Sequence, residues 1–116
     1  GIAREKANVF LPPYEWYNDS IAVWTKEAGY TLVNISSGTL TSQDWTVPDG
    51  NKYYSSDFLM KDLFDYEQKK GLNGYILLIH PATDPKRTDK LYNRLDEILT
   101  RLEKEGYSFH SFSELI

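Results

Sequence analysis

Cysteine is absent from the 116-residue sequence, and histidine occurs only twice. The lack of cysteine excludes disulfides, thiolate nucleophiles and zinc sites built from cysteine. No basic stripe accompanies the net charge of −4, so nucleic acid is not an expected partner. No apolar run approaches the roughly 20 residues that a membrane-spanning helix needs, and no signal-peptide pattern stands in the sequence.

Aromatic residues, by contrast, are plentiful: nine Tyr, five Phe and three Trp. Hydrophobic residues make up 41% of the chain and charged residues 26%, a balance typical of a folded domain with a buried core. The length favours one domain or partial domain over residues 1–116. Most aromatic rings are expected inside, and the excess is available for a ligand such as a sugar, whose C–H faces lie flat on aromatic rings.

Strand-like and helix-like segments alternate along the chain. Short apolar runs predict strands at residues 9–11, 30–35, 75–79 and 107–109. Capping residues and apolar spacing predict helices from Asn18 or Asp19 to about Ala28, from Ser55 or Ser56 to Gly71, and from Thr88 to Gly106. This alternation predicts βαβ units, a parallel sheet and therefore an α/β fold.

Two of these segments carry further expectations about burial. Ile21, Trp24 and Ala28 share the predicted inward face of the first helix. The run at residues 75–79 is apolar at every position, which is typical of a strand covered on both faces.

Three loops follow predicted strands, at the carboxyl ends where parallel α/β folds bind ligands. Each loop holds an unusual cluster: Pro12-Pro13-Tyr14-Glu15-Trp16-Tyr17-Asn18, Asp44-Trp45 and His80-Pro81. His80 suits general acid or base chemistry near neutral pH, or it is a strand-end histidine satisfied by backbone groups. Asp44 is placed to orient such an imidazole and Trp45 to exclude water from it, unless the pair is a turn with a buried anchor.

The remaining polar and aromatic residues of these loops have two interpretations each. Trp16 and Tyr17 are candidate platforms for stacking sugars, or they pack in the core. The charged residues after His80 are interpreted as a solvated loop: Asp84, Lys86, Arg87 and Asp89.

The segments Pro12-Pro13-Tyr14, Asp44-Trp45 and Leu78-Ile79-His80, each after a predicted strand, resemble the later motifs of the polysaccharide deacetylase family (carbohydrate esterase family four). The ending, Gly106-Tyr107-Ser108-Phe109 through Glu114-Leu115, is also similar to that family. The resemblance spans nearly the whole chain. It implies the C-terminal half of a distorted (β/α) barrel, in an enzyme that removes acetyl groups from sugar polymers with a divalent metal such as zinc.

The resemblance also implies a role for individual residues. His80 matches the histidine that protonates the leaving group, and Asp44 matches the carboxylate that tunes this histidine. Trp45 matches its hydrophobic neighbour, and Leu78 the leucine that helps to form the acetyl pocket. Tyr14 matches the residue whose backbone N–H helps to bind the oxyanion.

Several positions depart from the family pattern. Leu11 stands where the family usually has an arginine that positions the catalytic base, and Thr41 stands where it often has an aspartate. The first two motifs, which carry the base and the metal ligands, have no counterpart in this sequence, so we expect no metal site within the chain. His110 is interpreted as structural.

We therefore expect a part of a metal-dependent carbohydrate deacetylase that is inactive alone and acts on an acetylated polysaccharide or oligosaccharide. A non-catalytic carbohydrate-binding or structural module on the same scaffold is the alternative, favoured by Leu11. A flavodoxin-like domain fits the element order but lacks a glycine-rich phosphate loop. The first strand is expected to pair with the missing N-terminal half or with a second copy. By resemblance, the parent protein is extracellular or periplasmic.

Overall fold

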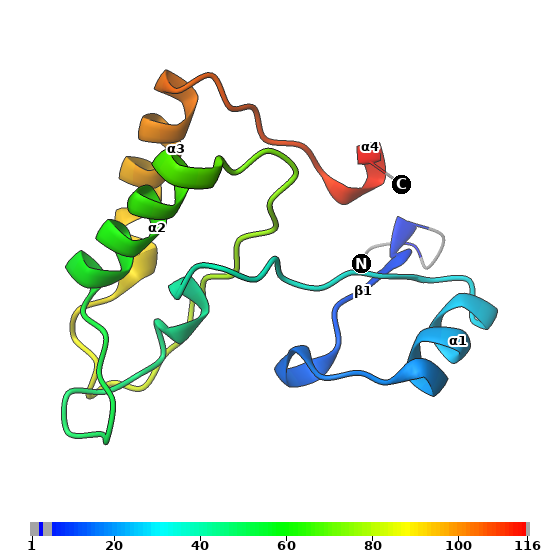
Figure 1. Cartoon of the computed structure of the whole chain (residues 1–116). Coiled ribbons are helices and arrows are strands. Elements are labelled where there is room, and N and C mark those ends of the chain that lie inside the picture. The colour runs from blue at the N-terminus through cyan, green and yellow to red at the C-terminus, as the bar shows by residue number, and fades with distance from the viewer. Residues whose placement is uncertain (1–2, 4–5, 116) are drawn as a thin grey trace. The chain divides into compact units, whose positions relative to one another are not determined.

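Two units make up the part of the chain that the computed structural model describes, namely residue 3 and residues 6–115. Unit 1 combines the chain up to Ile35 with the segment that starts at Phe109, and unit 2 spans Ser36–Ser108. Figure 1 shows the elements of both units in the order of the sequence.

Unit 1 contains a small parallel sheet and the helix that connects its strands (Figure 1). Strand β1 (Val9–Phe10) pairs with strand β2 (Thr31–Leu32), with Val9 opposite Thr31. Helix α1 (Asp19–Glu27) lies between them in the sequence and packs against β2. Parallel strands need a crossover of this kind. The predicted strand, helix and strand are thus confirmed in type, although both strands are shorter than predicted.

The ends of α1 follow local signals in the sequence, whereas its burial does not. The Asn18 side chain accepts a hydrogen bond from the Ile21 N–H at 3.0 Å, as expected of an N-cap. The predicted inward face is wrong in part, because Trp24 and Ala28 are exposed and only Ile21 is half-buried. Two short strands offer too little surface to cover a whole helix face. A four-residue helix, α4 (Phe112–Leu115), completes unit 1.

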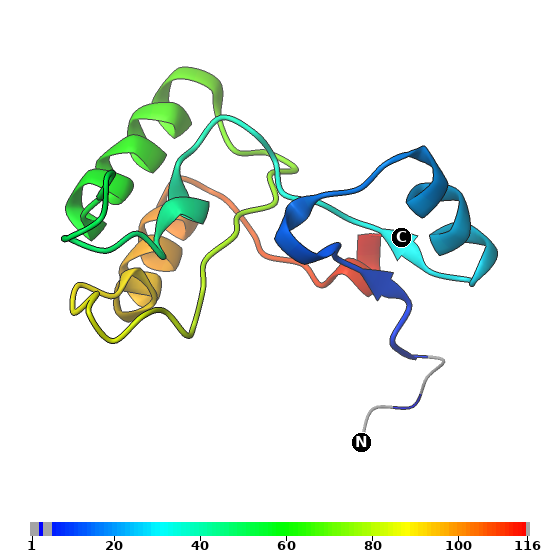
Figure 2. The same ribbon diagram turned by 90° about the horizontal axis from the view of Figure 1, so that it is seen from below.

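Unit 2 holds the hydrophobic core. Helices α2 (Ser56–Lys70) and α3 (Leu95–Lys104) lie side by side (Figures 1 and 2), and Arg101 of α3 lies over the Phe64 ring of α2, 3.4 Å from its centroid. The buried apolar side chains are Leu59, Met60, Leu63, Phe64, Leu72, Leu91, Ile98 and Leu102. In the described part of the chain, no helix is long and apolar enough to span a membrane.

Helix α2 begins and ends where the sequence predicts, but α3 does not. The Ser55 side chain caps α2 by accepting from the Phe58 N–H at 3.1 Å, and Gly71 follows the helix with a left-handed φ of 71°. The predicted start of the last long helix at Thr88 is wrong, because α3 begins at Leu95 after a short 3-10 helix, η4 (Leu91–Arg94). Hydrogen bonds from the buried Arg87 side chain and the half-buried Lys90 side chain hold residues 83–90 as a loop instead.

The predicted strands at residues 75–79 and 107–109 are absent, so the predicted four-stranded sheet is wrong for the described residues. Residues 75–79 are irregular and half-buried, not covered on both faces. Their contact with the chain around Ser36 consists of the Ser36 N–H donating to the Ile76 carbonyl at 3.0 Å and the Ile76 N–H donating to Ser36 Oγ at 2.9 Å. An apolar run becomes a strand only beside a partner that extends the ladder. The structure is mixed α/β, and a barrel stays a prediction.

Candidate functional site

Asp44 and His80 form a hydrogen-bonded pair in unit 2. His80 Nδ1 lies 2.6 Å from Asp44 Oδ1, and the His80 backbone N–H donates to Asp44 Oδ2 at 2.8 Å. The Asp44 side chain is 1% exposed and the His80 side chain 34% exposed. Each carboxylate oxygen therefore has a donor, which offsets the cost of burying the group. The predicted contact between these two residues is confirmed.

The pairing determines which nitrogen of the His80 ring is available. A carboxylate can only accept hydrogen bonds, so Nδ1 carries the hydrogen that Asp44 accepts. Nε2 is then the ring atom that can take up or release a proton toward another molecule. A part-exposed imidazole backed by a buried carboxylate is an arrangement suited to general acid–base chemistry.

A short turn places the Asp44 side chain in a buried position within unit 2. The 3-10 helix η3 (Thr41–Gln43) precedes it, and the Asp44 N–H donates to the Thr41 carbonyl at 3.2 Å. At the start of this turn, the Leu40 N–H donates to Asp62 Oδ2 of α2 at 2.7 Å. Helix α2 therefore anchors the segment that carries Asp44.

The interpretation of Arg87 as a solvated loop residue is wrong. Its side chain is fully buried, with Nη1 donating to the Thr46 carbonyl at 2.7 Å and to the Tyr54 carbonyl at 2.9 Å. The guanidinium also lies 5.2 Å from the centroid of the Tyr53 ring. Sequence reasoning missed this residue because its partners lie 33 to 41 residues away, and a lone arginine among charged neighbours resembles a solvated loop.

Asp89 belongs to the same buried network. It accepts from the Ser56 N–H at 2.6 Å and from the Tyr53 hydroxyl at 3.2 Å. Burial tends to raise the pKa of Asp89, but the hydrogen bonds from Ser56 and Tyr53 and the positive charge of Arg87 outweigh it. The pKa of Asp89 consequently lies below its ordinary value.

We expect this carboxylate to make the stability of unit 2 sensitive to acid. A folded-state pKa below the unfolded value of about 3.9 gives a contribution that is complete above about pH 4 and is lost as the pH falls through the folded-state value. Asp89→Asn should lower the unfolding free energy at pH 7 by about 1–2 kcal/mol and flatten its decline below about pH 4. Urea unfolding at pH 7 and pH 3 measures both effects. An Asp96→Asn control, at an exposed site in the first turn of α3, should have a much smaller effect on both quantities. Equal effects in both variants would contradict the assignment.

Neither Trp45 nor Leu78 belongs to the hydrophobic core of unit 2. Trp45 is 55% exposed, so Asp44 and not the tryptophan is the buried anchor of this turn. Leu77 and Ile79 pack against the core. Leu78, between them, is half-buried and is not among the side chains that pack against that core. The predicted contact of either residue with a substrate stays a prediction.

The loop that carries Tyr14, Trp16 and Tyr17 belongs to unit 1. Tyr14 is 94% exposed and Trp16 65% exposed, and Tyr17 is also exposed, so a packing role in the core does not hold for them. Tyr14 has φ 57° and Glu15 φ 56°, left-handed values that are uncommon for bulky residues and that occur often at functional sites. Asn34 Nδ2 holds the loop by donating to the Glu15 carbonyl at 2.8 Å. A meeting of this loop with His80 stays a prediction.

Metal ligands do not assemble in the residues that the structure describes. These residues contain no group of three or more His, Asp or Glu side chains that could hold a metal ion, so the residues present do not fit a metal centre. His110 lies in unit 1, with Nδ1 3.6 Å from Glu114 Oε2.

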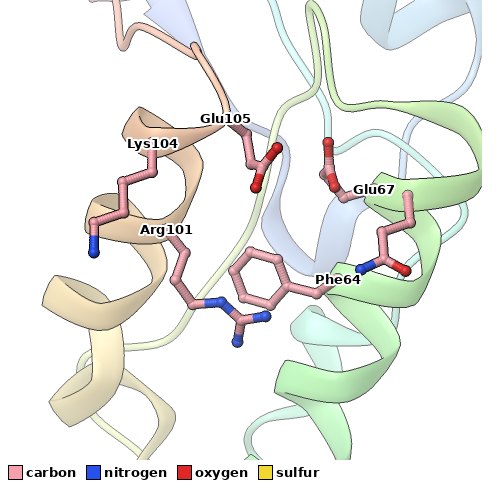
Figure 3. A pocket seen from close by; sticks show the side chains of 6 residues that line it. Phe64, Glu67, Arg101, Lys104 and Glu105 are labelled. Atoms are coloured by element: carbon pink, nitrogen blue, oxygen red, sulfur yellow. The ribbon is translucent and has the colours of Figure 1, made fainter.

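A separate pocket lies between α2 and α3, and no predicted site residue is among its lining residues. Figure 3 shows the Arg101 side chain alongside the Phe64 ring within it. Its lining residues are Phe64, Glu67, Gln68, Arg101, Lys104 and Glu105. The lining carries both charge signs beside one aromatic ring that Arg101 already covers, and this pattern favours no particular ligand.

Comparison with known proteins agrees with the motif pattern. The chain is 29% identical over 108 residues to a peptidoglycan-N-acetylglucosamine deacetylase of Bacillus cereus. The match covers 93% of this chain but only 45% of the relative, so the chain spans less than half the length of that protein. No protein-family model matches the chain, and no solved structure matches it. This distant similarity suggests the polysaccharide deacetylase family.

Proposed function

We propose that this chain is the part of a metal-dependent carbohydrate deacetylase that supplies the general-acid histidine and the acetyl pocket. The observation that carries the proposal is the buried Asp44 carboxylate, which holds Nδ1 of the part-exposed His80 at 2.6 Å. The similarity to a deacetylase over 93% of the chain supports it. The substrate is an N- or O-acetylated polysaccharide or oligosaccharide.

His80 acts in the step that releases the sugar. Cleavage of an acetyl C–N or C–O bond leaves a nitrogen or oxygen that must take up a proton. His80 holds that proton on Nε2 and delivers it, while Asp44 accepts from Nδ1, orients the ring and stabilises its positive charge. The divalent metal of the proposal is held by residues outside this chain.

In this proposal, each of the other predicted residues has its own role toward the acetyl group or the sugar. The Tyr14 backbone N–H stabilises the negative charge that develops on the acetyl oxygen. The loop that carries Tyr14 is closed by two other backbone donors: the Glu15 N–H donates to the Pro12 carbonyl and the Trp16 N–H to the Pro13 carbonyl. Leu78 helps to form the acetyl pocket, and Trp45 is the hydrophobic neighbour of the Asp44–His80 pair on the substrate side. The exposed Trp16 and Tyr17 rings stack on sugar faces.

The proposal is tested by exchanging the matched segment of the Bacillus cereus enzyme for this chain. The match covers 45% of the Bacillus cereus enzyme, and the chimera keeps the other 55% of that enzyme. The chimera should release acetate from acetylated peptidoglycan, and the isolated 116-residue chain should not. A chimera that folds and binds metal but releases no acetate would contradict a catalytic role.

A non-catalytic carbohydrate-binding module on the same scaffold is the second candidate, and Leu11 favours it. An aliphatic side chain cannot replace the arginine that positions the base in the family, and Leu11 is exposed at the end of β1. This candidate predicts binding of acetylated oligosaccharides by the isolated chain, detectable by calorimetry, with an inactive chimera.

The partner of the chain is proposed from the free edge of β1. Within the described residues β1 pairs with β2 alone, so one edge of β1 offers unpaired backbone groups. We propose that the metal-binding half of an extracellular or periplasmic parent protein covers this edge.

We expect the isolated chain to associate with itself through β1, because a second copy can extend the free ladder. Light scattering across a concentration series should show a mass that rises above that of one 13.5 kDa chain. Leu11→Lys, next to β1, should restore the monomer, since charge at an edge opposes pairing. A monomer at every concentration, with slow hydrogen exchange at Val9 and Phe10, would exclude edge pairing.

A further inference from the structure

We propose that Arg87 is a positioning residue that holds the turn bearing Asp44 in the geometry that His80 requires. The inference rests on the proposed function, in which the pairing of Asp44 with His80 prepares the proton donor. Neither the sequence motifs nor the similarity to the Bacillus cereus relative assigns a role to Arg87.

The Arg87 side chain joins three segments of unit 2. It extends from the loop that follows His80 and donates to the carbonyls of Thr46, at 2.7 Å, and Tyr54, at 2.9 Å. Its Nη2 lies 3.4 Å from Oγ of Ser56, the first residue of α2. One fully buried guanidinium therefore ties the loop after His80 to the turn after Asp44 and to the start of α2.

Thr46 carries this connection back to Asp44. Its Oγ1 donates to the Gln43 carbonyl at 2.9 Å and accepts from the Tyr54 N–H at 3.1 Å. Gln43 directly precedes Asp44, so the residues on both sides of the carboxylate are held. A rotation of this turn would move the Asp44 carboxylate away from Nδ1 of His80. Among the described residues no other side chain hydrogen-bonds to that ring nitrogen, so Nδ1 would lose its partner.

The surroundings of Arg87 indicate that its side chain positions the turn bearing Asp44 more than it stabilises the fold. Its hydrogen-bond acceptors are neutral, and its Nε–H has no acceptor among the described residues. The Asp89 carboxylate is near enough for Arg87 to lower its pKa, but it makes no direct hydrogen bond to the guanidinium. Burying a cation in this way is costly, and an apolar side chain of similar volume often stabilises a core as well or better. A planar fork of donors, however, can hold several carbonyls at set angles, which no apolar side chain can do.

The test observes the His80 ring directly, in the 116-residue chain labelled with nitrogen-15. The spectra report the Nδ1–H proton and the fraction of His80 protonated at Nδ1. Arg87→Met fills the volume without donating, and we expect the hydrogen-bonded Nδ1–H signal of His80 to disappear. Arg87→Lys keeps the charge but not the fork, and we expect partial loss. The signals of His110, in unit 1, should not change.

Two controls separate positioning from general destabilisation. Leu102→Ala removes a buried core contact on α3 and should keep the His80 signal in every molecule that is folded. Asp44→Asn should abolish the signal. A folded Arg87→Met chain with an unchanged signal would overturn the proposal, as would equal loss in Leu102→Ala. If Arg87→Met does not fold, Arg87→Lys decides the question by the same signal.

The deacetylase chimera provides a second readout that distinguishes this inference from the proposed function. Arg87→Lys should lower kcat by up to about 100-fold, the cost of displacing a reacting group by about 1 Å, with KM nearly unchanged. An inactive parent chimera would contradict the proposed function and leave the spectroscopic result to decide on Arg87. An active chimera with unaltered kcat in Arg87→Lys would overturn the inference alone.

Discussion

Replacing His80 by alanine in the active chimera should lower kcat by about 10²–10⁴, the usual contribution of a positioned general acid. Alanine removes the ring whose Nε2 delivers the proton, so the leaving nitrogen or oxygen must take its proton from water. KM should change much less, because the ring contributes to the transition state more than to binding. Acetate release at saturating substrate, near neutral pH, measures the effect.

The second histidine of the chain provides a matched control. His110→Ala removes an identical side chain from unit 1, where it lies near Glu114, and should leave kcat within about two-fold of the parent. Asp44→Asn should fall between the two variants or match His80→Ala, because the amide can present a donor to Nδ1 and reverse the ring's hydrogen bonding. Unchanged turnover in His80→Ala would show that His80 is structural and that the motif resemblance does not extend to its role.

Replacing Leu63 by alanine should lower the unfolding free energy of unit 2 by about 2–5 kcal/mol, the cost of truncating a buried leucine. Leu63 is 0% exposed on α2 and belongs to the cluster that joins α2 to α3. The loss is large relative to the 5–15 kcal/mol that is typical of whole domains. Urea unfolding followed by far-ultraviolet circular dichroism measures the change.

Leu95→Ala provides the matched comparison, since it removes the same atoms from an α3 residue that is 41% exposed. We expect it to cost about 1 kcal/mol or less, because a surface site leaves no cavity. Similar losses at the two positions would show that the core does not lie between α2 and α3 in solution.

The central pair of the site could be predicted because each member follows a recognisable segment. Asp44 and His80 were expected near one another from their places after predicted strands and from the resemblance to deacetylase motifs. The contact at 2.6 Å agrees, although residues 75–79 do not form a strand. The irregular backbone before His80 still brings it to Asp44, so this contact does not need a continuous ladder.

The start of the last helix could not be predicted from periodicity. Thr88 has the residue type of a cap, but Lys90 Nζ donates to Thr83 and Asp84, and Arg87 donates to Thr46 and Tyr54. These hydrogen bonds hold the backbone before Leu91 as a loop and delay the regular helix to Leu95.

The amino-acid sequence by itself determined the features that depend on neighbours within one helical turn. These include the Asn18 cap of α1, the Ser55 cap and Gly71 end of α2, and the apolar spacing that buries Leu59 and Leu63. Such contacts lie three or four residues apart, so local types suffice to predict them.

Only the tertiary structure decided which apolar runs became strands and which charged side chains were buried. A strand needs a second backbone that continues its ladder, and in the described chain a single backbone–backbone hydrogen bond, from Ser36 to Ile76, joins residues 75–79 to a distant segment. A buried arginine needs acceptors, and those of Arg87 lie 33 and 41 residues earlier in the sequence. Both outcomes depend on groups that chain folding brings together, and no local pattern of residue types contains that information.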